Sequence, residues 1–210
     1  MNKNYSIIRT CEYEKLKQTT VHGQILDIGG STKSGYHTLL KGAEKITTSN
    51  IDSSYGCDLV FDIQKTFPLE PNSFDTVISM NVLEHIFDFH PVFSEVYRVL
   101  KPGGAFVSST PFMFHVHGSP DDYFRYTESA LRGLAAKHGF VVERMEVLGY
   151  GVFSLLWQTV GGVIPTTTLK YIGKNVSILL DKALLHFHPF EKLRNRIPLG
   201  YFWVFKKHEV

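Results

Sequence analysis

The chain lacks several features that mark secreted, nucleic-acid-binding or disordered proteins. It contains two cysteines, Cys11 and Cys57, without a Cys-x-x-Cys spacing, and its first residues, Met1 to Ser6, lack the apolar core of a secretory signal. Lys and Arg number 22 against 20 Asp and Glu, so the formal net charge of +2 gives no electrostatic case for nucleic acid as a partner. We therefore expect a cytoplasmic protein with reduced thiols that does not act on nucleic acid.

The sequence is also poor in long apolar runs that could cross a membrane. An uncharged stretch from Val147 to Leu169 has about the length of a spanning helix. Glycines and Pro165 interrupt this stretch, and three threonines follow the proline. We therefore expect a partly apolar cap or groove lining there. Peripheral membrane contact through residues 149–169 is the second interpretation, and a true span is a distant third.

The length and composition fit one folded domain of the α/β class. The 210 residues are 43% hydrophobic and 13% aromatic, enough to bury a sizeable core. Apolar runs of strand length alternate with stretches of helical periodicity, which is typical of an α/β fold. The predicted strands are 23–28, 45–51, 57–63, 74–80, 105–110, 140–148 and 200–206, and the predicted helices are 5–20, 34–41, 91–100, 128–138 and 175–187.

The last two predicted strands are separated by about fifty residues, too many for a plain loop in a compact domain. Residues 175–187 within this segment have the apolar spacing of a helix. We therefore expect a helical insertion over residues 149–198.

A glycine-rich turn follows the first predicted strand. Gly29 and Gly30 allow the backbone to approach a ligand closely, and the N–H groups that open the next predicted helix would point into the same space. Asp27 lies at the end of the strand, where it could receive an ammonium group. Asp52 ends the following strand, about 20 residues after Gly30, where nucleoside-binding α/β folds hold ribose hydroxyls. Asp62 ends the third predicted strand and could accept a hydrogen bond from an adenine amino group.

Several blocks in this order resemble the class I S-adenosylmethionine-dependent methyltransferases, in particular the type 11 domain. The turn reads Asp27-x-Gly29-x-Ser31-x-Lys33, close to that family's acidic-x-Gly-x-Gly-x-Gly, with serine and lysine in place of two glycines. The later blocks are Ser73-Phe-Asp-Thr-Val, Val82-Leu-Glu-His and Val99-Leu-Lys-Pro-Gly-Gly. The similarity spans roughly residues 23–147.

The resemblance implies a Rossmann-like, mostly parallel seven-stranded sheet with helices on both faces. It also implies a single methyltransferase domain over residues 1–210, with S-adenosylmethionine as cofactor. In that case Asp27 would face the methionine ammonium group, Asp52 the ribose and Asp62 the adenine. The expected cofactor contacts are Asp27, Gly29, Gly30, Ser31, Ile51, Asp52, Asp62, Ile63, Met80 and Asn81.

A second stretch, residues 112–126, holds more titratable groups than a structural loop requires. Its Asp-Asp-Tyr-Phe-Arg-Tyr-Thr block is similar to one in bacterial methyltransferases of this class that are often associated with surface glycan or small-metabolite pathways. This similarity implies methyl transfer to a small-molecule or glycan-like acceptor, at oxygen. The candidate catalytic residues are His85, His117 and Asp122, and the candidate substrate-binding residues are His115, Asp121, Tyr123, Arg125 and Tyr126.

Alternatives remain open on the sequence alone. His115 and His117 with Asp121 or Asp122 could bind a metal, but no second ligand cluster of known spacing supports one, and we expect none. His85 could be a half-buried structural residue, and Asp122 could simply pair with Arg125. A non-catalytic S-adenosylmethionine-binding module is the first alternative function. A nicotinamide-dependent oxidoreductase is the second, although it leaves Asp27 and the Leu-Glu-His block without a role.

Overall fold

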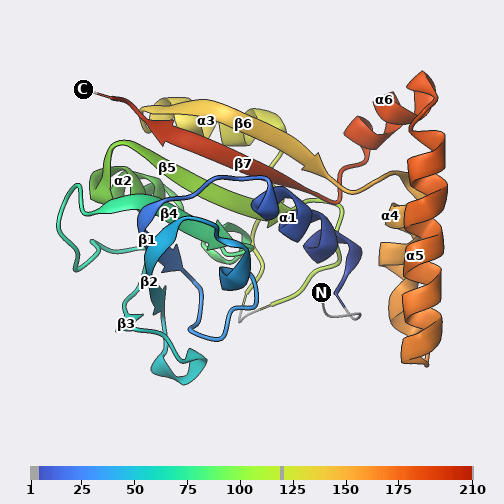
Figure 1. The fold of residues 1–210 in the computed structure, drawn as a ribbon, viewed down its shortest axis with the longest axis horizontal. Coiled ribbons are helices and arrows are strands. Elements are labelled where there is room, and N and C mark those ends of the chain that lie inside the picture. Colours follow the sequence, from blue (N-terminus) through green and yellow to red (C-terminus); the bar gives the residue numbers. More distant parts are fainter. Residues whose placement is uncertain (1–4, 119–120, 210) are drawn as a thin grey trace.

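The protein is built on a seven-stranded sheet in the order β3-β2-β1-β4-β5-β7-β6 (Figure 1). A computed structural model describes residues 5–118 and 121–209. The five strands from β3 to β5 are parallel, and β7 runs antiparallel to both of its neighbours. The strands are β1 (Gly23–Ile28), β2 (Ala43–Asn50), β3 (Leu59–Val60), β4 (Phe74–Met80), β5 (Leu100–Pro111), β6 (Phe140–Leu148) and β7 (Gly200–Lys207). This confirms the predicted mostly parallel, Rossmann-like sheet.

Helices cover both faces of the sheet. α1 (Ile7–Lys17) packs on one face, where Ile7, Ile8 and Leu16 are buried in one hydrophobic cluster. α2 (His90–Val99) and α3 (Glu128–Lys137) pack on the other face in a second cluster. β1, β4 and β5 are buried on both sides over most of their length, as expected for central parallel strands, and Thr76, Ser79 and Ser108 are buried there beside the apolar side chains.

Three helices stand between β6 and β7 at one end of the molecule: α4 (Val152–Val160), α5 (Thr167–Leu184) and α6 (His188–Arg196) (Figure 1). We call residues 149–198 the insertion. The buried carboxylate of Asp181 on α5 accepts hydrogen bonds from the backbone N–H groups of Phe153 and Ser154 at the start of α4, at 3.0 and 2.7 Å. This contact satisfies N–H groups that have no partner within α4, and it holds the two helices together.

Two predicted elements are shorter in the structure. The strand expected at 57–63 pairs with β2 only at Leu59 and Val60. The helix expected at 34–41 is wrong: only a 3₁₀ turn, His37–Leu39, forms there. Tyr36 and His37 instead direct their side chains onto Asp27, and this bonding draws the segment down over the end of β1. The helix N-terminus predicted to point at the glycine turn is therefore not formed by residues 34–41.

Candidate functional site

Two cavities meet at Asn81. The larger of this pair, called the larger cavity below, lies at the carboxyl ends of β1, β2 and β4. Its volume is about 340 Å³. Ligands in open α/β sheets bind at this edge, where the chain crosses from one side of the sheet to the other. The lining residues are Gly29, Asn50, Ile51, Tyr55, Phe61, Asp62, Ile63, Gln64, Asn81, Val82, His85, Ile86, Asp121 and Tyr123.

The glycine turn closes one side of this cavity and has no room for larger residues. Gly29 has a φ of 75°, and a Cβ added there would lie 2.4 Å from a methyl carbon of Val82. A Cβ added at Gly30 would lie 2.0 Å from Oδ2 of Asp27. The amide of Asn50 donates to the carbonyls of both glycines, at 3.2 and 3.1 Å. The turn is therefore fixed in shape, and glycine is required at both positions.

Asp27 holds the turn from below rather than lining the cavity. Its side chain is fully buried, and its Oδ2 accepts hydrogen bonds from the Tyr36 hydroxyl at 2.8 Å and from Nε2 of His37 at 2.7 Å. Burial raises the pKa of this carboxyl above its ordinary value. The lone pairs predicted to face the cofactor's ammonium group are thus already engaged. Ser31 also lies outside the lining, where its hydroxyl accepts from the Lys33 N–H.

The acids after β2 and β3 differ in position. Asp62 lines the cavity; its Oδ1 accepts from the Gln64 N–H at 2.9 Å, and its Oδ2 lies 3.7 Å from the Lys65 ammonium. Asp52 is exposed and does not line the cavity; its Oδ1 accepts from the Ser54 N–H at 2.7 Å and caps a 3₁₀ turn. Its neighbour Ile51 does line the cavity. The predicted ribose contact of Asp52 requires its carboxylate to leave this cap.

Asn81 joins the larger cavity to a smaller one of about 130 Å³. The smaller cavity is lined by Ser6, Ile8, Arg9, Glu12, Asn81, Pro111, Phe114 and His117. Asn81 follows the last residue of β4, Met80, and adopts a left-handed φ of 56°, which is uncommon outside glycine. Its buried Oδ1 has no hydrogen-bond partner among the described residues. Strained residues with unsatisfied polar atoms are typical of functional sites.

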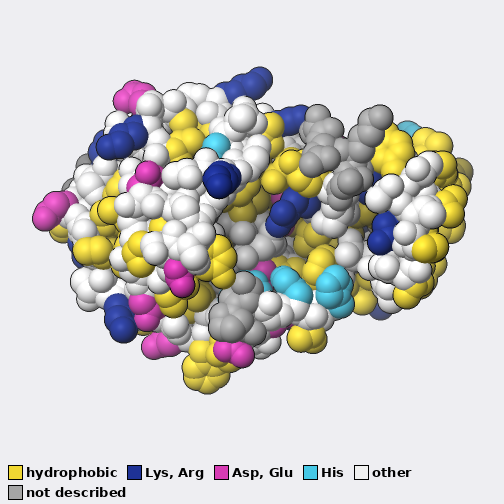
Figure 2. Space-filling view, turned by 90° about the horizontal axis from the view of Figure 1, so that it is seen from below, with side chains coloured by type: hydrophobic (Ala, Val, Ile, Leu, Met, Phe, Trp, Pro, Cys, Tyr) yellow, Lys and Arg dark blue, Asp and Glu magenta, His cyan; other side chains and the backbone are white. Residues whose placement is uncertain are grey.

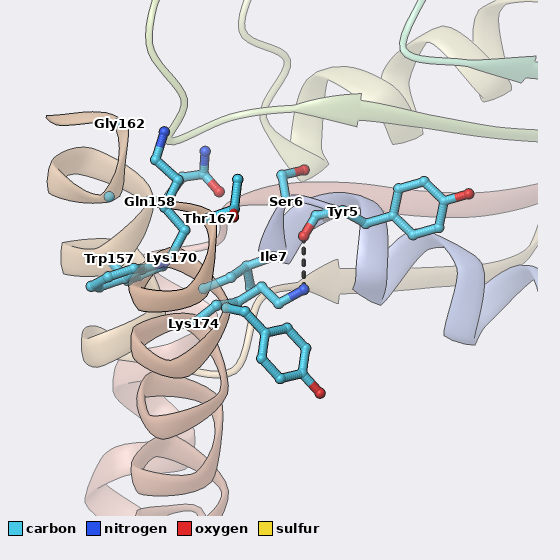
Figure 3. A pocket seen from close by; sticks show the side chains of 11 residues that line it. Tyr5, Ser6, Ile7, Trp157, Gln158, Gly162, Thr167, Lys170 and Lys174 are labelled. Carbon is cyan, nitrogen blue, oxygen red and sulfur yellow. Dashed lines mark hydrogen bonds between the residues drawn. The ribbon is translucent and has the colours of Figure 1, made fainter. Parts of the chain in front are cut away.

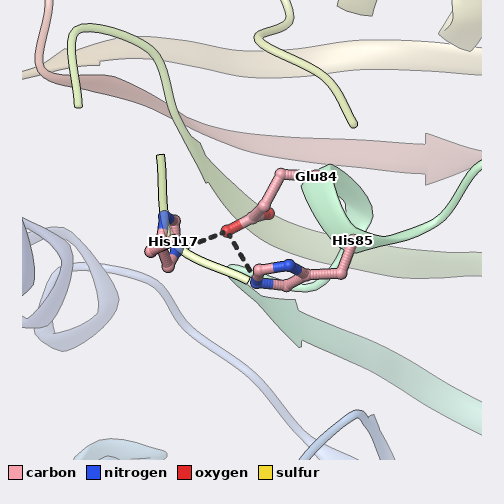
Figure 4. Close-up of side chains that lie close together, drawn as sticks. All are labelled: Glu84, His85 and His117. Atoms are coloured by element: carbon pink, nitrogen blue, oxygen red, sulfur yellow. Dashed lines mark ion pairs between the residues drawn. The ribbon is translucent and has the colours of Figure 1, made fainter. Parts of the chain in front are cut away.

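Glu84, His85 and His117 meet beside this junction (Figure 4). His85 lines the larger cavity and His117 the smaller one. Oε1 of Glu84 lies 3.8 Å from Nε2 of His85 and 3.9 Å from Nε2 of His117. The Glu84 side chain is fully buried, and burial raises its pKa to about 8. Histidine side chains are visible on this face of the molecule, between the body of the sheet and the insertion (Figure 2).

Glu84 is not among the site residues predicted from the sequence. The Leu-Glu-His block served there only as a family motif, and a role was predicted for its histidine alone. The available signal was a carboxylate next to Leu83, in the turn that follows a buried strand. A charged side chain at such a position is rarely buried without a specific partner or function.

The loop of residues 112–126 is fastened to this cluster; residues 119 and 120 lie outside the described part. The side chain of Asp122 is 1% exposed, and its two oxygens accept hydrogen bonds from the two terminal guanidinium nitrogens of Arg125 at 2.5 and 2.6 Å. This pairing holds the pKa of Asp122 well below its usual range. Asp122 also accepts from the His117 N–H at 2.9 Å. Asp122 therefore positions His117, and its carboxylate is not free to act as a base.

The remaining predicted substrate residues separate into three environments. Asp121 and Tyr123 line the larger cavity, where the Tyr123 hydroxyl donates to Asp121. Tyr126 is buried in the core and its hydroxyl donates to the Leu83 carbonyl, so it supports the turn of Glu84 from behind. His115 is exposed and stacks on Phe114.

A third cavity of about 360 Å³ lies at the seam between the start of α1 and the insertion (Figure 3). Its lining includes Ile7, Trp157 and Tyr171, and the Lys174 ammonium donates to the Tyr5 carbonyl across the seam at 2.9 Å. Ser6 lines both this cavity and the smaller cavity beside Asn81. Shared lining residues therefore link the three cavities in a row from the sheet edge to the insertion.

Comparison with known proteins finds similarity to methyltransferases. Residues 36–108 match the model of a methyltransferase domain. A segment of 44 residues is 48% identical to a Mycolicibacterium smegmatis protein named as a probable S-adenosylmethionine-dependent methyltransferase. Over these residues the chain is similar to S-adenosylmethionine-dependent methyltransferases. The segment matched to the mycobacterial protein covers 21% of this chain and 17% of that protein.

Solved structures share the fold of this chain at low sequence identity. An S-adenosylmethionine-dependent methyltransferase of Mesorhizobium loti has a TM-score of 0.61 and 17% identity, over 94% of this chain and 98% of that one. The [4+2]-cyclase SpnF has a TM-score of 0.62 and 14% identity, over 100% of this chain and 86% of that one. At these identities the likeness shows the fold, and the acceptor has to be argued from the site.

The residues that line the larger cavity are suited to S-adenosylmethionine, the cofactor of the methyltransferases matched above. The two glycines leave a cradle that a Cβ would fill. Asp62 presents an acceptor, and apolar Phe61, Ile63 and Ile86 line the wall beside it, a combination suited to a nucleoside.

Proposed function

We propose that this protein methylates a hydroxyl of a small-molecule or glycan-like acceptor, with the cofactor in the larger cavity and the acceptor in the smaller one. The observation that carries the proposal is that both cavities end at Asn81, beside His85 and His117. Methyl transfer requires the nucleophile, the methyl carbon and the sulfonium to lie in a line. Two cavities that meet at one residue supply such a line.

The side chains at this junction have separate tasks. Gly29, Ile51, Asp62 and Ile63 hold the cofactor, which supplies an electrophilic methyl group on a good leaving group. His85 and His117 stand where a hydroxyl nucleophile would lose its proton, and Asp122 orients His117 through the backbone. A base is needed for a hydroxyl acceptor and is dispensable for an unprotonated amine, so this arrangement favours oxygen as the methylated atom.

Calorimetry with S-adenosylmethionine and with its demethylated product tests the cofactor site. Asp62→Ala removes an acceptor from the cavity wall and is expected to weaken binding by about 1 to 3 kcal/mol. Asp52→Ala is the matched comparison, since this carboxylate lies one residue beyond the lining. A loss confined to Asp52→Ala would show that the cap opens and that Asp52 is the ribose ligand. If neither variant weakens binding, the cofactor assignment of this cavity is wrong.

A turnover assay separates an enzyme from a binding module. Formation of the demethylated product is measured against a panel of hydroxylated metabolites and glycans, with matched amines as the comparison class. Turnover with hydroxyl acceptors supports the proposal, and turnover with amines alone contradicts the oxygen assignment. Tight cofactor binding without turnover on any acceptor would favour the non-catalytic alternative.

We further propose that the insertion rests on an anionic membrane surface and receives the acceptor there. The apolar side chains of α5 that are 43–68% exposed fall within an arc of about 100° on one face of the helix. The insertion carries six Lys or Arg and two Asp or Glu, of which Asp181 is buried. Apolar area together with net positive charge is what an interfacial helix uses on anionic lipid. The exposed apolar residues are Leu156, Val160, Val163, Leu169, Ile172, Val176, Leu179, Leu180 and Phe187.

This contact would be peripheral. Among the residues that the structure describes, no helix is both long and apolar enough to cross a membrane. Flotation with anionic and with neutral vesicles tests the proposal. The double variant Val163→Glu, Leu179→Glu should stay unbound where the parent floats with anionic vesicles. Val141→Glu, at a valine on β6 that is 46% exposed, should float like the parent. Equal behaviour of the parent in both vesicle types, or no flotation at all, would refute the membrane contact.

A further inference from the structure

The lone pairs of Glu84, His85 and His117 converge on one point. Nδ1 of His85 lies 2.6 Å from the Asp121 carbonyl and Nδ1 of His117 lies 3.3 Å from the His115 carbonyl. A carbonyl only accepts, so each ring carries its proton on Nδ1 and leaves a bare lone pair on Nε2. Both Nε2 atoms face Oε1 of Glu84. Two imidazole lone pairs and a carboxyl oxygen thus surround a common space.

A proton alone does not bridge these atoms. The separations of 3.8 and 3.9 Å exceed the range of a hydrogen bond. Oε1 of Glu84 is buried and has no hydrogen-bond partner among the described residues, although such an atom is costly to leave unsatisfied. The three ligand atoms all lie within 4.8 Å of one another. A cation between them would satisfy all three at once.

We propose that Glu84 Oε1, His85 Nε2 and His117 Nε2 bind a divalent first-row transition-metal ion such as Zn²⁺. Bonds of about 2.0 to 2.2 Å to nitrogen and oxygen fit this space if the ligand atoms close in by roughly half an ångström. Two imidazoles and one carboxylate favour such a metal over Mg²⁺ or Ca²⁺, which take oxygen ligands. The backbone carbonyls that hold both Nδ1 atoms are the usual outer support of metal-bound histidines.

The position of the ion suggests its role. His85 lines the cofactor cavity and His117 the acceptor cavity, so an open coordination position would face the reacting atoms. The side chain of His117 is 33% exposed, which gives the ion a path of entry. An ion there would bind the acceptor oxygen and favour loss of its proton to water. Both Nε2 atoms would then be ligands, so this role would replace the proton removal assigned above to His85 and His117. The O–CH₃ bond then forms as the S–CH₃ bond breaks. This role rests on the proposed function, whereas the site itself does not.

Cobalt titration of metal-free, tag-free protein tests the site without cofactor or acceptor. We expect one equivalent of Co²⁺ to bind with a visible absorption spectrum, and Zn²⁺ to displace it. His85→Ala and His117→Ala should each weaken binding by at least about tenfold, because outer-sphere changes alone cost that much. His115→Ala removes a histidine of the same loop that lies outside the cluster and should bind like the parent.

The possible outcomes test the metal site separately from the proposed methyl transfer. Absence of a one-to-one complex would overturn the proposal, and so would equal binding by the parent and both cluster variants. If His85→Ala proves unstable in thermal melts, His117→Ala and Glu84→Gln decide the question. Stoichiometric binding in a protein without methyl-transfer activity would leave the metal site standing and refute the proposed function.

Discussion

Substituting Gly30 by alanine tests whether Asp27 and the glycine turn form one rigid unit. The added Cβ would lie 2.0 Å from Oδ2 and 2.3 Å from Cγ of Asp27, far inside van der Waals contact. Asp27 has little freedom to retreat, because it is fully buried and the same Oδ2 accepts from Tyr36 and His37. Relief therefore requires the turn to move or at least one of these bonds to break.

The expected loss of stability follows from those bonds. A hydrogen bond to a charged group contributes about 1.5 to 3 kcal/mol, so Gly30→Ala should lower the free energy of unfolding by about this amount. For a chain of this size each kcal/mol corresponds to about 2 to 4 °C in melting temperature, which predicts a fall of about 3 to 12 °C. Movement of the turn should also weaken binding of S-adenosylmethionine, because Gly29 lines the cavity.

Gly133→Ala is the matched control. Gly133 lies inside α3 and an added Cβ would meet nothing within 4 Å. Alanine is favoured over glycine in a helix by about 0.5 to 1 kcal/mol, so this variant should melt slightly higher than the parent. Differential scanning calorimetry measures both variants, and titration with the cofactor follows. Unchanged melting and affinity in Gly30→Ala would refute the rigid coupling of Asp27 to the turn.

Three further predictions address other buried groups. Burial raises the pKa of Glu12 above its ordinary value of 4.5, so its neutral form contributes stability that is lost as pH rises through the folded-state pKa. Glu12→Gln should match the parent near pH 4 and melt higher than it near pH 8; a constant difference across pH would contradict this. Cys11 is buried and its pKa is raised to about 11, so a thiol reagent should titrate one cysteine, Cys57, in the native protein and both after denaturation. Rapid modification of both thiols in the native state would contradict the burial of α1. Arg125→Ala should cost about 1.5 to 3 kcal/mol, because Asp122 loses both of its guanidinium contacts, and adding Asp122→Asn should restore part of that stability. A double variant no more stable than Arg125→Ala would place the loss elsewhere.

Elements fixed by local patterns were predictable from the sequence. β1, β4 and β6 have the predicted limits, because turn-forming residues such as Gly29, Asn81 and Gly149 directly follow them. The helical insertion followed from the distance between the last two strands. The segment after β1 was not predictable in the same way. Its residues have helical character, but Tyr36 and His37 gain more by bonding a buried carboxylate, and this partner lies outside any local window.

The roles of the candidate site residues are harder still to predict from local sequence, because they too depend on tertiary contacts. Asp62, Asn81 and His85 line the expected cavity because their places at the strand ends fix them. Asp52 and Asp122 also lie at motif positions, yet one caps a turn and the other is paired with Arg125. Residue type and spacing are the same for an acid that faces a ligand and one that caps a turn. Only the direction of the side chain separates them, and tertiary contacts set that direction.

The division between cofactor and acceptor residues has a consequence for specificity. The segment that matches the methyltransferase domain ends at residue 108, before the loop of 112–126 and the insertion. The cofactor cavity is built largely from the matched segment, whereas Pro111, Phe114 and His117 of the smaller cavity come after it. The seam cavity is closed by Trp157 and Tyr171 of the insertion. Asp121 and Tyr123 of the same loop line the larger cavity, so only residues 111–117 and the insertion can change without touching it. A chain that exchanged residues 111–117 and the insertion with a related methyltransferase should therefore exchange acceptors and keep its cofactor affinity.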